Sequence, residues 1–312
     1  MDEQHPAPVV VGVDGSETAL HAVGWATREA RRRGAPLRIV HAAPYAEGSA
    51  SGERHAGSIL TLAHTVATRT LPDLPAVTER LPGPMPQALV DAGRGAQLLV
   101  VGMSGGSRYD DVLLHSAALD VCAAAVCPVA VVRGRSDVPA RGPVVLGVED
   151  VKADAKAVTV AFADAERHAS RLVVVHTMRA RDSTRGFHPG HHTDDTLRTD
   201  IINRLGSWRS RHPDVPVELQ VVSGAAAGHL LEFSVTARLL VLGTHARAAA
   251  ARAIPGSTSR TILRCSSCPV VVVTRDAVLA ESSASAPSAA PTQPAAGPER
   301  WTLYVKDRGR RG

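Results

Sequence analysis

The sequence predicts an α/β fold that occurs in two tandem copies. Three observations lead to this prediction. A Cys-Pro-Val motif followed by a β-branched run occurs at Cys127 and again at Cys268. Apolar runs typical of strands alternate with amphipathic stretches typical of helices, which favours a parallel sheet covered on both faces. The chain has 312 residues, enough for two domains of ordinary size.

Other segments align between the two halves at nearly the same spacing. "LLVVGMSGG" from Leu98 lies over "LLVLGTHAR" from Leu239 at the offset of 141 that also relates Cys127 to Cys268. Near the start of each half the offset is 135, with "VVVGVDGS" over "VVLGVEDV". The second half therefore holds about six extra residues, which we expect in "TRGFHPGHHTDD". A repeat of this length indicates tandem domains, because solenoid repeats have periods of ~20 to 50 residues.

The repeat gives the expected domain boundaries. We predict a first domain over residues 1–136, a second over 137–275 and a disordered tail over 276–312. The tail contains "ESSASAPSAAPTQPAAGP", which has too few large apolar side chains to form a core. Its basic end reads "KDRGRRG".

Each copy is expected to form its elements in the same order. A strand opens the copy (9–13 and 144–148), and a helix follows that ends, in the first copy, with arginines before Gly34. The second strand is "LRIVHA" or "RLVVVHT". A helix and a polar strand come next, at "AVTERL" or "PVELQVV". The unit then continues through a helix, a fourth strand ("AQLLVVG" or "ARLLVLG"), a glycine-containing loop, a last helix and the Val-rich strand after Cys-Pro.

Composition excludes several classes of protein. Hydrophobic residues make up 44% of the chain and charged residues 21%, but no apolar run approaches the ~18 residues of a membrane span. The polar, acidic start and four cysteines lead us to expect a cytoplasmic protein with reduced thiols. The net charge is +5, yet basic residues concentrate only at the end of the chain, so nucleic-acid binding is a minor hypothesis.

Ligands of open parallel sheets bind at the carboxyl ends of the strands. There the first copy places Gly102-Met-Ser-Gly105, nine residues and then His115-Ser116. The second copy places Gly243-Thr-His-Ala246, nine residues and then Gly256-Ser257. We expect Ser116 and Ser257 to begin helices. Small residues beside a helix N-terminus suit a phosphate group.

This arrangement resembles the universal stress protein family, whose ATP-binding members carry Gly-x-x-Gly, nine residues and then Gly-Ser or Gly-Thr. The resemblance covers both repeats and includes "VVGVDGS" and "CPV". It implies five parallel strands in each domain, in an adenine nucleotide alpha hydrolase-like, Rossmann-like fold. It also implies that the two Val-rich strands pair to form an internal pseudo-dimer, and it is compatible with a homodimer.

The resemblance implies nucleotide-binding residues in both copies. These are Asp14, Gly15, Ser16, Ala42, Gly102, Gly105 and Ser116 in the first copy, and Thr177, Gly243, Gly256 and Ser257 in the second. Neither copy matches the family completely. His115 stands where the family has glycine, and Glu149, Asp150 and Val151 replace Asp-Gly-Ser. The added carboxylates are unfavourable for an anionic ligand.

The resulting hypothesis is a regulatory stress-response factor that binds ATP, with or without Mg²⁺, and an unidentified protein partner. We expect no enzyme activity, because no catalytic set of residues falls on the ligand edge. Three alternatives remain open. They are an interaction module whose degenerate sites bind no nucleotide, a slow ATPase, and a nucleic-acid-binding protein that uses the basic end.

Some conspicuous residues have simpler interpretations. Asp14, Ser116 and Ser257 are also suited to cap helices. His41 and His176 are expected to be buried and hydrogen-bonded, and Cys265 and Cys268 to pack in the core. His188, His191, His192, Asp194 and Asp195 are more consistent with a solvated insertion than with a metal site, because nothing fixes their geometry.

Overall fold

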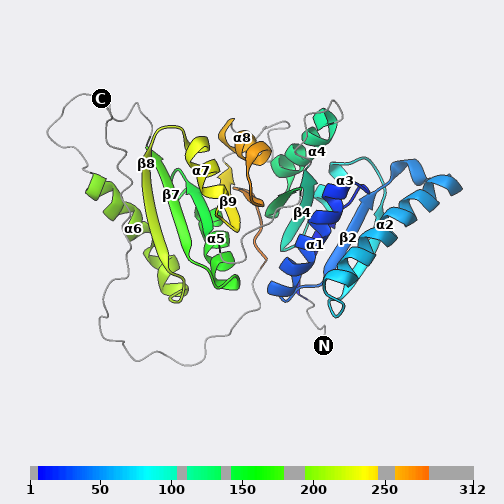
Figure 1. Ribbon diagram of the computed structural model, residues 1–312, viewed down its shortest axis with the longest axis horizontal. Coiled ribbons are helices and arrows are strands. Elements are labelled where there is room, and N and C mark those ends of the chain that lie inside the picture. Colours follow the sequence, from blue (N-terminus) through cyan, green and yellow to red (C-terminus); the bar gives the residue numbers. More distant parts are fainter. Residues whose placement is uncertain (1–5, 104–110, 135–141, 179–193, 245–256, 281–312) are drawn as a thin grey trace.

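The computed structural model describes residues 6–103, 111–134, 142–178, 194–244 and 257–280 (Figure 1). The elements of the first repeat are β1 (Val9–Gly12), α1 (Glu17–Arg32), β2 (Leu37–Ala42), the short 3-10 helix η1 (Pro44–Ala46), α2 (Ala50–Thr70), β3 (Ala76–Leu81), α3 (Gln87–Ala92), β4 (Leu98–Met103), α4 (Asp111–Ala124) and β5 (Val129–Arg133). Those of the second are β6 (Val144–Val148), α5 (Ala155–Arg167), β7 (Leu172–Met178), α6 (Asp194–Arg211), β8 (Val217–Ser223), α7 (Ala226–Ser234), β9 (Leu239–Thr244), α8 (Ser257–Cys265) and β10 (Val270–Thr274).

The strands form one ten-stranded sheet in the order β3-β2-β1-β4-β5-β10-β9-β6-β7-β8. Within each repeat all five strands are parallel. The α/β prediction of two five-stranded units is confirmed. The extra residues of the second repeat fall between β7 and β8, as expected, but the segment proposed to contain them lies mostly in residues 179–193, outside the described part of the chain.

The two repeats join through the Val-rich strands that follow the Cys-Pro motifs. β5 and β10 are antiparallel, with Val131 opposite Val270 and Ala130 opposite Val271. Val270, Val271 and Val272 are all nearly inaccessible to solvent. The antiparallel pairing gives each five-stranded unit a partner instead of an open edge. The predicted internal pseudo-dimer is therefore confirmed.

Helices cover both faces of the sheet, and the core on each face extends across the two repeats. One face packs against α1, α2, α5 and α6, and its cluster includes Ala130 and Val271 from the joining strands. The other face packs against α3, α4, α7 and α8 and includes Val131 and Val270. The side chains of the joining strands alternate between the two faces, so the junction has a continuous core on both sides.

Local sequence signals set the ends of α1. Ser16 is the N-cap, since its hydroxyl accepts a hydrogen bond from the Ala19 N–H at 3.2 Å. Gly34 follows the helix with φ of 59°, a conformation that glycine adopts without strain. The helix thus begins directly after the turn at Asp14 and Gly15, which places that turn at the carboxyl edge of the sheet.

One predicted helix start is wrong. α4 begins at Asp111, so Ser116 lies inside the helix and does not begin it. The preceding residues Leu113 and Leu114 favour a helix. By contrast, Pro255 and Gly256 precede Ser257, where α8 begins as expected.

The first residues of the predicted tail pack against the first repeat. Ala277 is fully buried, and the Val278 N–H donates to the carbonyl oxygen of Val126 at 2.6 Å. Residues 281–312 lie outside the described part of the chain. Among the helices that are described, none has both the length and the apolar character required to cross a bilayer.

Candidate functional site

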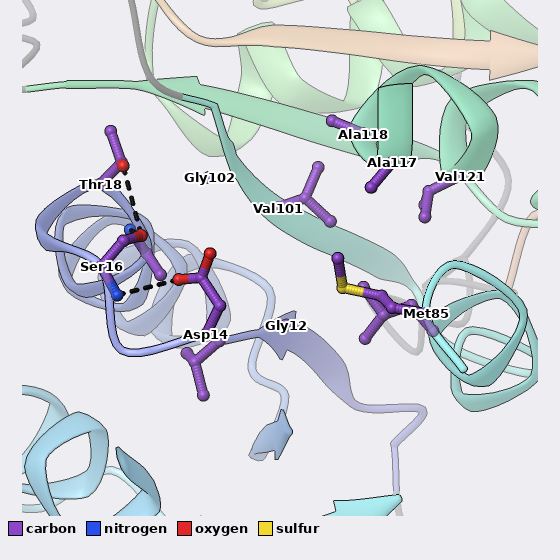
Figure 2. A pocket seen from close by; sticks show the side chains of 13 residues that line it. Gly12, Asp14, Ser16, Thr18, Met85, Val101, Gly102, Ala117, Ala118 and Val121 are labelled. Carbon is purple, nitrogen blue, oxygen red and sulfur yellow. Dashed lines mark hydrogen bonds between the residues drawn. The ribbon is translucent and has the colours of Figure 1, made fainter. Parts of the chain in front are cut away.

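The first repeat has a small cavity at the carboxyl edge of its sheet, between the ends of β1 and β4 (Figure 2). It encloses about 50 Å³. Its lining comes from the end of β1, the start of α1, α3 and the segment before it, the end of β4 and α4: Gly12, Val13, Asp14, Ser16, Thr18, Ala19, Met85, Leu89, Val101, Gly102, Ala117, Ala118 and Val121. The lining is mostly apolar, with polar groups concentrated at the start of α1.

Asp14, Gly15 and Ser16 form a tight polar turn at the mouth of this cavity. One carboxylate oxygen of Asp14 accepts a hydrogen bond from the Ser16 N–H at 2.9 Å (Figure 2). Gly15 has φ of 87°, which favours glycine. Asp14 therefore organises the turn, and Ser16, not Asp14, caps the helix. The exposed Asp14 carboxylate keeps a second oxygen that makes no hydrogen bond within the described residues.

Gly102 brings the end of β4 against the start of α1. A Cβ at Gly102 would lie 2.9 Å from the carbonyl oxygen of Thr18 and 3.0 Å from the Ala19 nitrogen. Real Cβ atoms do not approach backbone so closely, so only glycine permits this contact without a shift of the helix. The glycine thus holds β4 and the capped end of α1 together beneath the cavity.

The structure brings some predicted site residues together and separates others. Asp14, Ser16 and Gly102 line the cavity, and Gly15 lies in the same turn. Ala42 ends β2 at the same edge of the sheet but does not line the cavity. Gly105 lies outside the described residues, and the side chains of His115 and Ser116 are likewise not described.

The apolar lining was not predicted from sequence. Met85 and Leu89 are four residues apart, and Ala117 and Val121 repeat that spacing on α4. Such spacing indicates one face of a helix, but it does not distinguish a face that packs on the core from one that lines a cavity. Met85 is 38% exposed and extends toward Val101 in Figure 2.

Among the described residues, the predicted site residues of the second repeat do not all line one hollow. Thr177 lies in β7, Gly243 in β9 and Ser257 at the start of α8, and Gly256 is outside the described residues. A more open hollow of about 500 Å³ lies beside α5 and the ends of β9 and β10. It includes Gly243 but neither Thr177 nor Ser257.

A buried carboxylate, that of Asp154, lies at the start of the second repeat's first helix. Asp154 is the N-cap residue of α5 and is 5% exposed. Its Oδ2 atom accepts hydrogen bonds from the backbone N–H groups of Glu149 at 3.1 Å and Asp150 at 3.3 Å. A Cβ at Gly243 would collide with the Asp154 carboxylate. Asp154 was not among the site residues predicted from the sequence.

The expectation for the paired histidines is confirmed for His41 and only in part for His176, which is hydrogen-bonded but only partly buried. His41 is buried and its Nδ1 donates to the Val13 carbonyl oxygen at 2.6 Å, so its Nε2 is left to accept from the Tyr45 hydroxyl at 2.9 Å. His176 makes the corresponding contact with Val148 at 3.2 Å. Each histidine ties the first and second strands of its repeat together at the ligand edge.

The cysteine prediction is right for one residue of the pair and wrong for the other. Cys268 is buried, and burial raises the pKa of its thiol to about 11. Cys265 is exposed, because it ends α8 and the chain turns inward only at Ser266 and Cys268. Both thiols are free.

Metal ligands do not gather in the described part of the chain: no group of three His, Cys, Asp or Glu side chains could hold an ion there. His188, His191 and His192 belong to residues 179–193, which are not described. The side chains of Asp194 and Asp195, at the start of α6, are also not described.

Comparison with known proteins gives consistent results. The model of the universal stress protein family matches residues 7–133 and 141–274. A universal stress protein of Mycolicibacterium smegmatis is 32% identical over 282 residues, which cover 85% of this chain and 96% of that protein.

A solved structure supports the same fold. The crystal structure of a universal stress protein from Archaeoglobus fulgidus superposes with a TM-score of 0.64 at 15% identity and covers 86% of this chain and 98% of that one. A universal stress protein solved in complex with cAMP matches 40% of this chain and 96% of its own, at 28% identity and a TM-score of 0.35.

Proposed function

The chain belongs to the universal stress protein family, and from that membership we propose that its first repeat binds an adenine nucleotide and that the protein acts as a regulatory factor in the stress response. The observation that supports this most strongly is the turn at Asp14 and Gly15. Within the described residues, neither backbone N–H group of this turn makes a hydrogen bond. Unused donors at a ligand edge are suited to a polar ligand.

The groups around the cavity fit the parts of a nucleotide. The second oxygen of Asp14 is an acceptor at the surface and suits a ribose hydroxyl. The apolar side chains of Met85, Leu89 and Val101 offer contact area to a base. Gly102 adds no side chain where the phosphates are expected from the family pattern. Mg²⁺ would accompany those phosphates as part of the ligand.

The cavity must widen to admit a whole nucleotide. Its volume of about 50 Å³ is well below the roughly 300–1,000 Å³ of pockets that hold small molecules. Met85 is the half-exposed, flexible side chain on the lining and is therefore the group we expect to move. Binding would then order the edge of the first repeat and change the surface offered to a partner.

We propose binding, not turnover, as the output. Asp14 is the only titratable side chain among the described residues that line the cavity, so no nucleophile and general base lie side by side there. We place this activity in the cytoplasm, where thiols that are free in the structure stay reduced.

Thermal melting of the intact protein tests the proposal. ATP with and without Mg²⁺, ADP, AMP and cAMP are added to separate samples. A ligand present at about 100 times its Kd stabilises the folded state by about 2.7 kcal/mol, so at least one nucleotide should raise the Tm by several degrees. If none of them shifts the Tm at millimolar concentration, nucleotide binding is contradicted and a protein-interaction module is favoured.

A further inference from the structure

We infer that the Asp154 carboxylate closes the second repeat to nucleotide by occupying two backbone donors whose counterparts in the first repeat make no hydrogen bond within the described residues. The protein would then bind one nucleotide per chain, in the first repeat. This inference rests on the proposed function, because it names which of the two sites performs it. It follows from a comparison of the two repeats at equivalent positions.

In the first repeat the turn after β1 keeps its donors available. Asp14 and Gly15 stand five and six residues after Val9, where β1 begins. Their N–H groups make no hydrogen bond within the described residues. Ala19 lies ten residues after Val9, is buried at the start of α1, and ends in a methyl group that accepts no hydrogen bond.

In the second repeat the same positions carry a different arrangement. Glu149 and Asp150 stand five and six residues after Val144, where β6 begins, and Asp154 stands ten after it. Asp154 therefore takes the place of Ala19. Its carboxylate accepts from both N–H groups that correspond to the unused pair, at 3.1 and 3.3 Å. The donors of the turn are thus satisfied from within the chain.

The start of the helix is displaced as well. α5 begins at Ala155, eleven residues after the first residue of β6, whereas α1 begins at Glu17, eight residues after the first residue of β1. The carboxylate lies against Gly243, where a side chain would collide with it, and both residues line the open hollow beside α5. Gly243 is the counterpart of Gly102, which instead contacts the backbone at Thr18 and Ala19.

A nucleotide cannot readily displace this carboxylate. Asp154 is 5% exposed, and the N–H groups of Glu149 and Asp150 stabilise its charge in this buried position. A ligand that took those donors would leave a buried carboxylate without them. An anionic ligand would also have to approach that charge closely. Both effects oppose binding at the second site.

The exposed carboxylates of Glu149 and Asp150 are a weaker explanation for a closed site. Both residues lie at the surface, where water and salt screen their charge. Asp150 also accepts from the Ala153 N–H at 2.7 Å and lies 3.8 Å from the guanidinium of Arg204, which offsets part of its charge. The two explanations predict that different variants gain a second nucleotide site.

Equilibrium dialysis of the intact protein with labelled Mg-ATP distinguishes them. The wild type is expected to bind about one equivalent. Asp154→Ala, and Asp154→Ser, which places a hydroxyl at the N-cap position, should each bind about two. In a Gly102→Val background, Asp154→Ala should keep one site, now in the second repeat. The matched control Glu149→Gln/Asp150→Asn should still bind one.

The results separate this inference from the function on which it rests. Two equivalents in the wild type, or one equivalent in both folded Asp154 variants, would overturn the inference and leave nucleotide binding intact. A second site in the Glu149→Gln/Asp150→Asn control would assign the closure to surface charge and also overturn it. If neither the wild type nor any variant binds nucleotide, the proposed function is contradicted, and the inference that rests on it fails as well.

Amide exchange gives a measurement that needs no nucleotide. In the ligand-free protein the Glu149 and Asp150 amides should exchange at least several-fold more slowly than those of Asp14 and Gly15, after correction for sequence. Asp154→Ala should abolish that difference. Equal rates in the wild type would show that the carboxylate does not hold these donors and would overturn the inference.

Discussion

The guanidinium of Arg33, directly after α1, lies 2.7 Å from the carboxylate of Asp164 in α5 and so joins the two repeats. Arg33 also lies 3.0 Å from Glu29, and Asp164 lies 2.8 Å from Arg167. Glu29 and Asp164 are fully buried and stand at equivalent positions of the two repeats. Buried charges persist when each has a partner, so this network is specific to the observed pairing of the repeats.

Arg33→Ala should destabilise the protein strongly. It would leave Glu29 and Asp164 buried with fewer partners, and breaking a buried pair in this way typically costs about 3–5 kcal/mol. Denaturant unfolding of wild type and variant measures the change. Arg94→Ala is the matched control, because Arg94 pairs with Asp91 at the exposed surface and should have little effect. Equal stability of Arg33→Ala and the wild type would show that the contact does not hold the repeats together.

Glu29 should make stability depend on acid pH. Burial alone raises its pKa, but the charge of Arg33, the hydrogen bond and charge of His168, and the charge of Arg32 outweigh burial and hold the pKa well below 4.5. The resulting stabilisation is complete above the ordinary pKa near 4.5 and is lost as pH falls below it toward the lowered pKa. The stability difference between wild type and Glu29→Gln should therefore shrink between about pH 6 and pH 3. A constant difference across that range would contradict the assignment.

The four cysteines should differ sharply in reactivity. Burial raises the pKa of Cys122 to about 12, of Cys127 to about 12 and of Cys268 to about 11, so thiolate is scarce at these three sites near pH 8. Cys265 is exposed. Brief alkylation of the native protein with iodoacetamide, read by peptide mass spectrometry, should modify Cys265 alone. The unfolded protein is the control and should be modified at all four cysteines. Early labelling of Cys127 or Cys268 in the native protein would contradict the burial of these residues beside the joining strands β5 and β10.

Gly102→Val should weaken nucleotide binding by at least tenfold without unfolding the chain. The new side chain would press on the backbone at Thr18 and Ala19 and shift the capped end of α1. Gly57→Ala is the control, since nothing lies within 4 Å of a Cβ at that exposed helical position. Titration calorimetry compares the two. Unchanged affinity in Gly102→Val would place the ligand elsewhere.

Sequence reasoning recovered the strands and their repeat because both depend on local pattern. β1 and β6, like β4 and β9, are β-branched or leucine-rich runs that recur at a fixed spacing. The pairing of β5 with β10 came from the family resemblance. The error at Ser116 arose because the shared spacing from the glycine loop was given more weight than the helix-forming residues before it.

The contacts that distinguish the two sites could not be predicted from sequence. Arg33 and Asp164 are 131 residues apart and meet only after both repeats fold and pair. Asp154 was overlooked because its role depends on the displaced start of α5, and cap positions are poorly defined by sequence alone. The side chains Glu149 and Asp150 attracted attention instead, although the structure uses their backbone N–H groups.

Isothermal titration of Mg-ATP into the intact wild-type chain tests the central claim most directly. The difference between Ala19 and Asp154 at equivalent positions predicts saturable binding with about one nucleotide per chain. Absence of binding at millimolar ATP would contradict the assignment of the first repeat as a nucleotide site. Two equivalent sites would contradict the closure of the second.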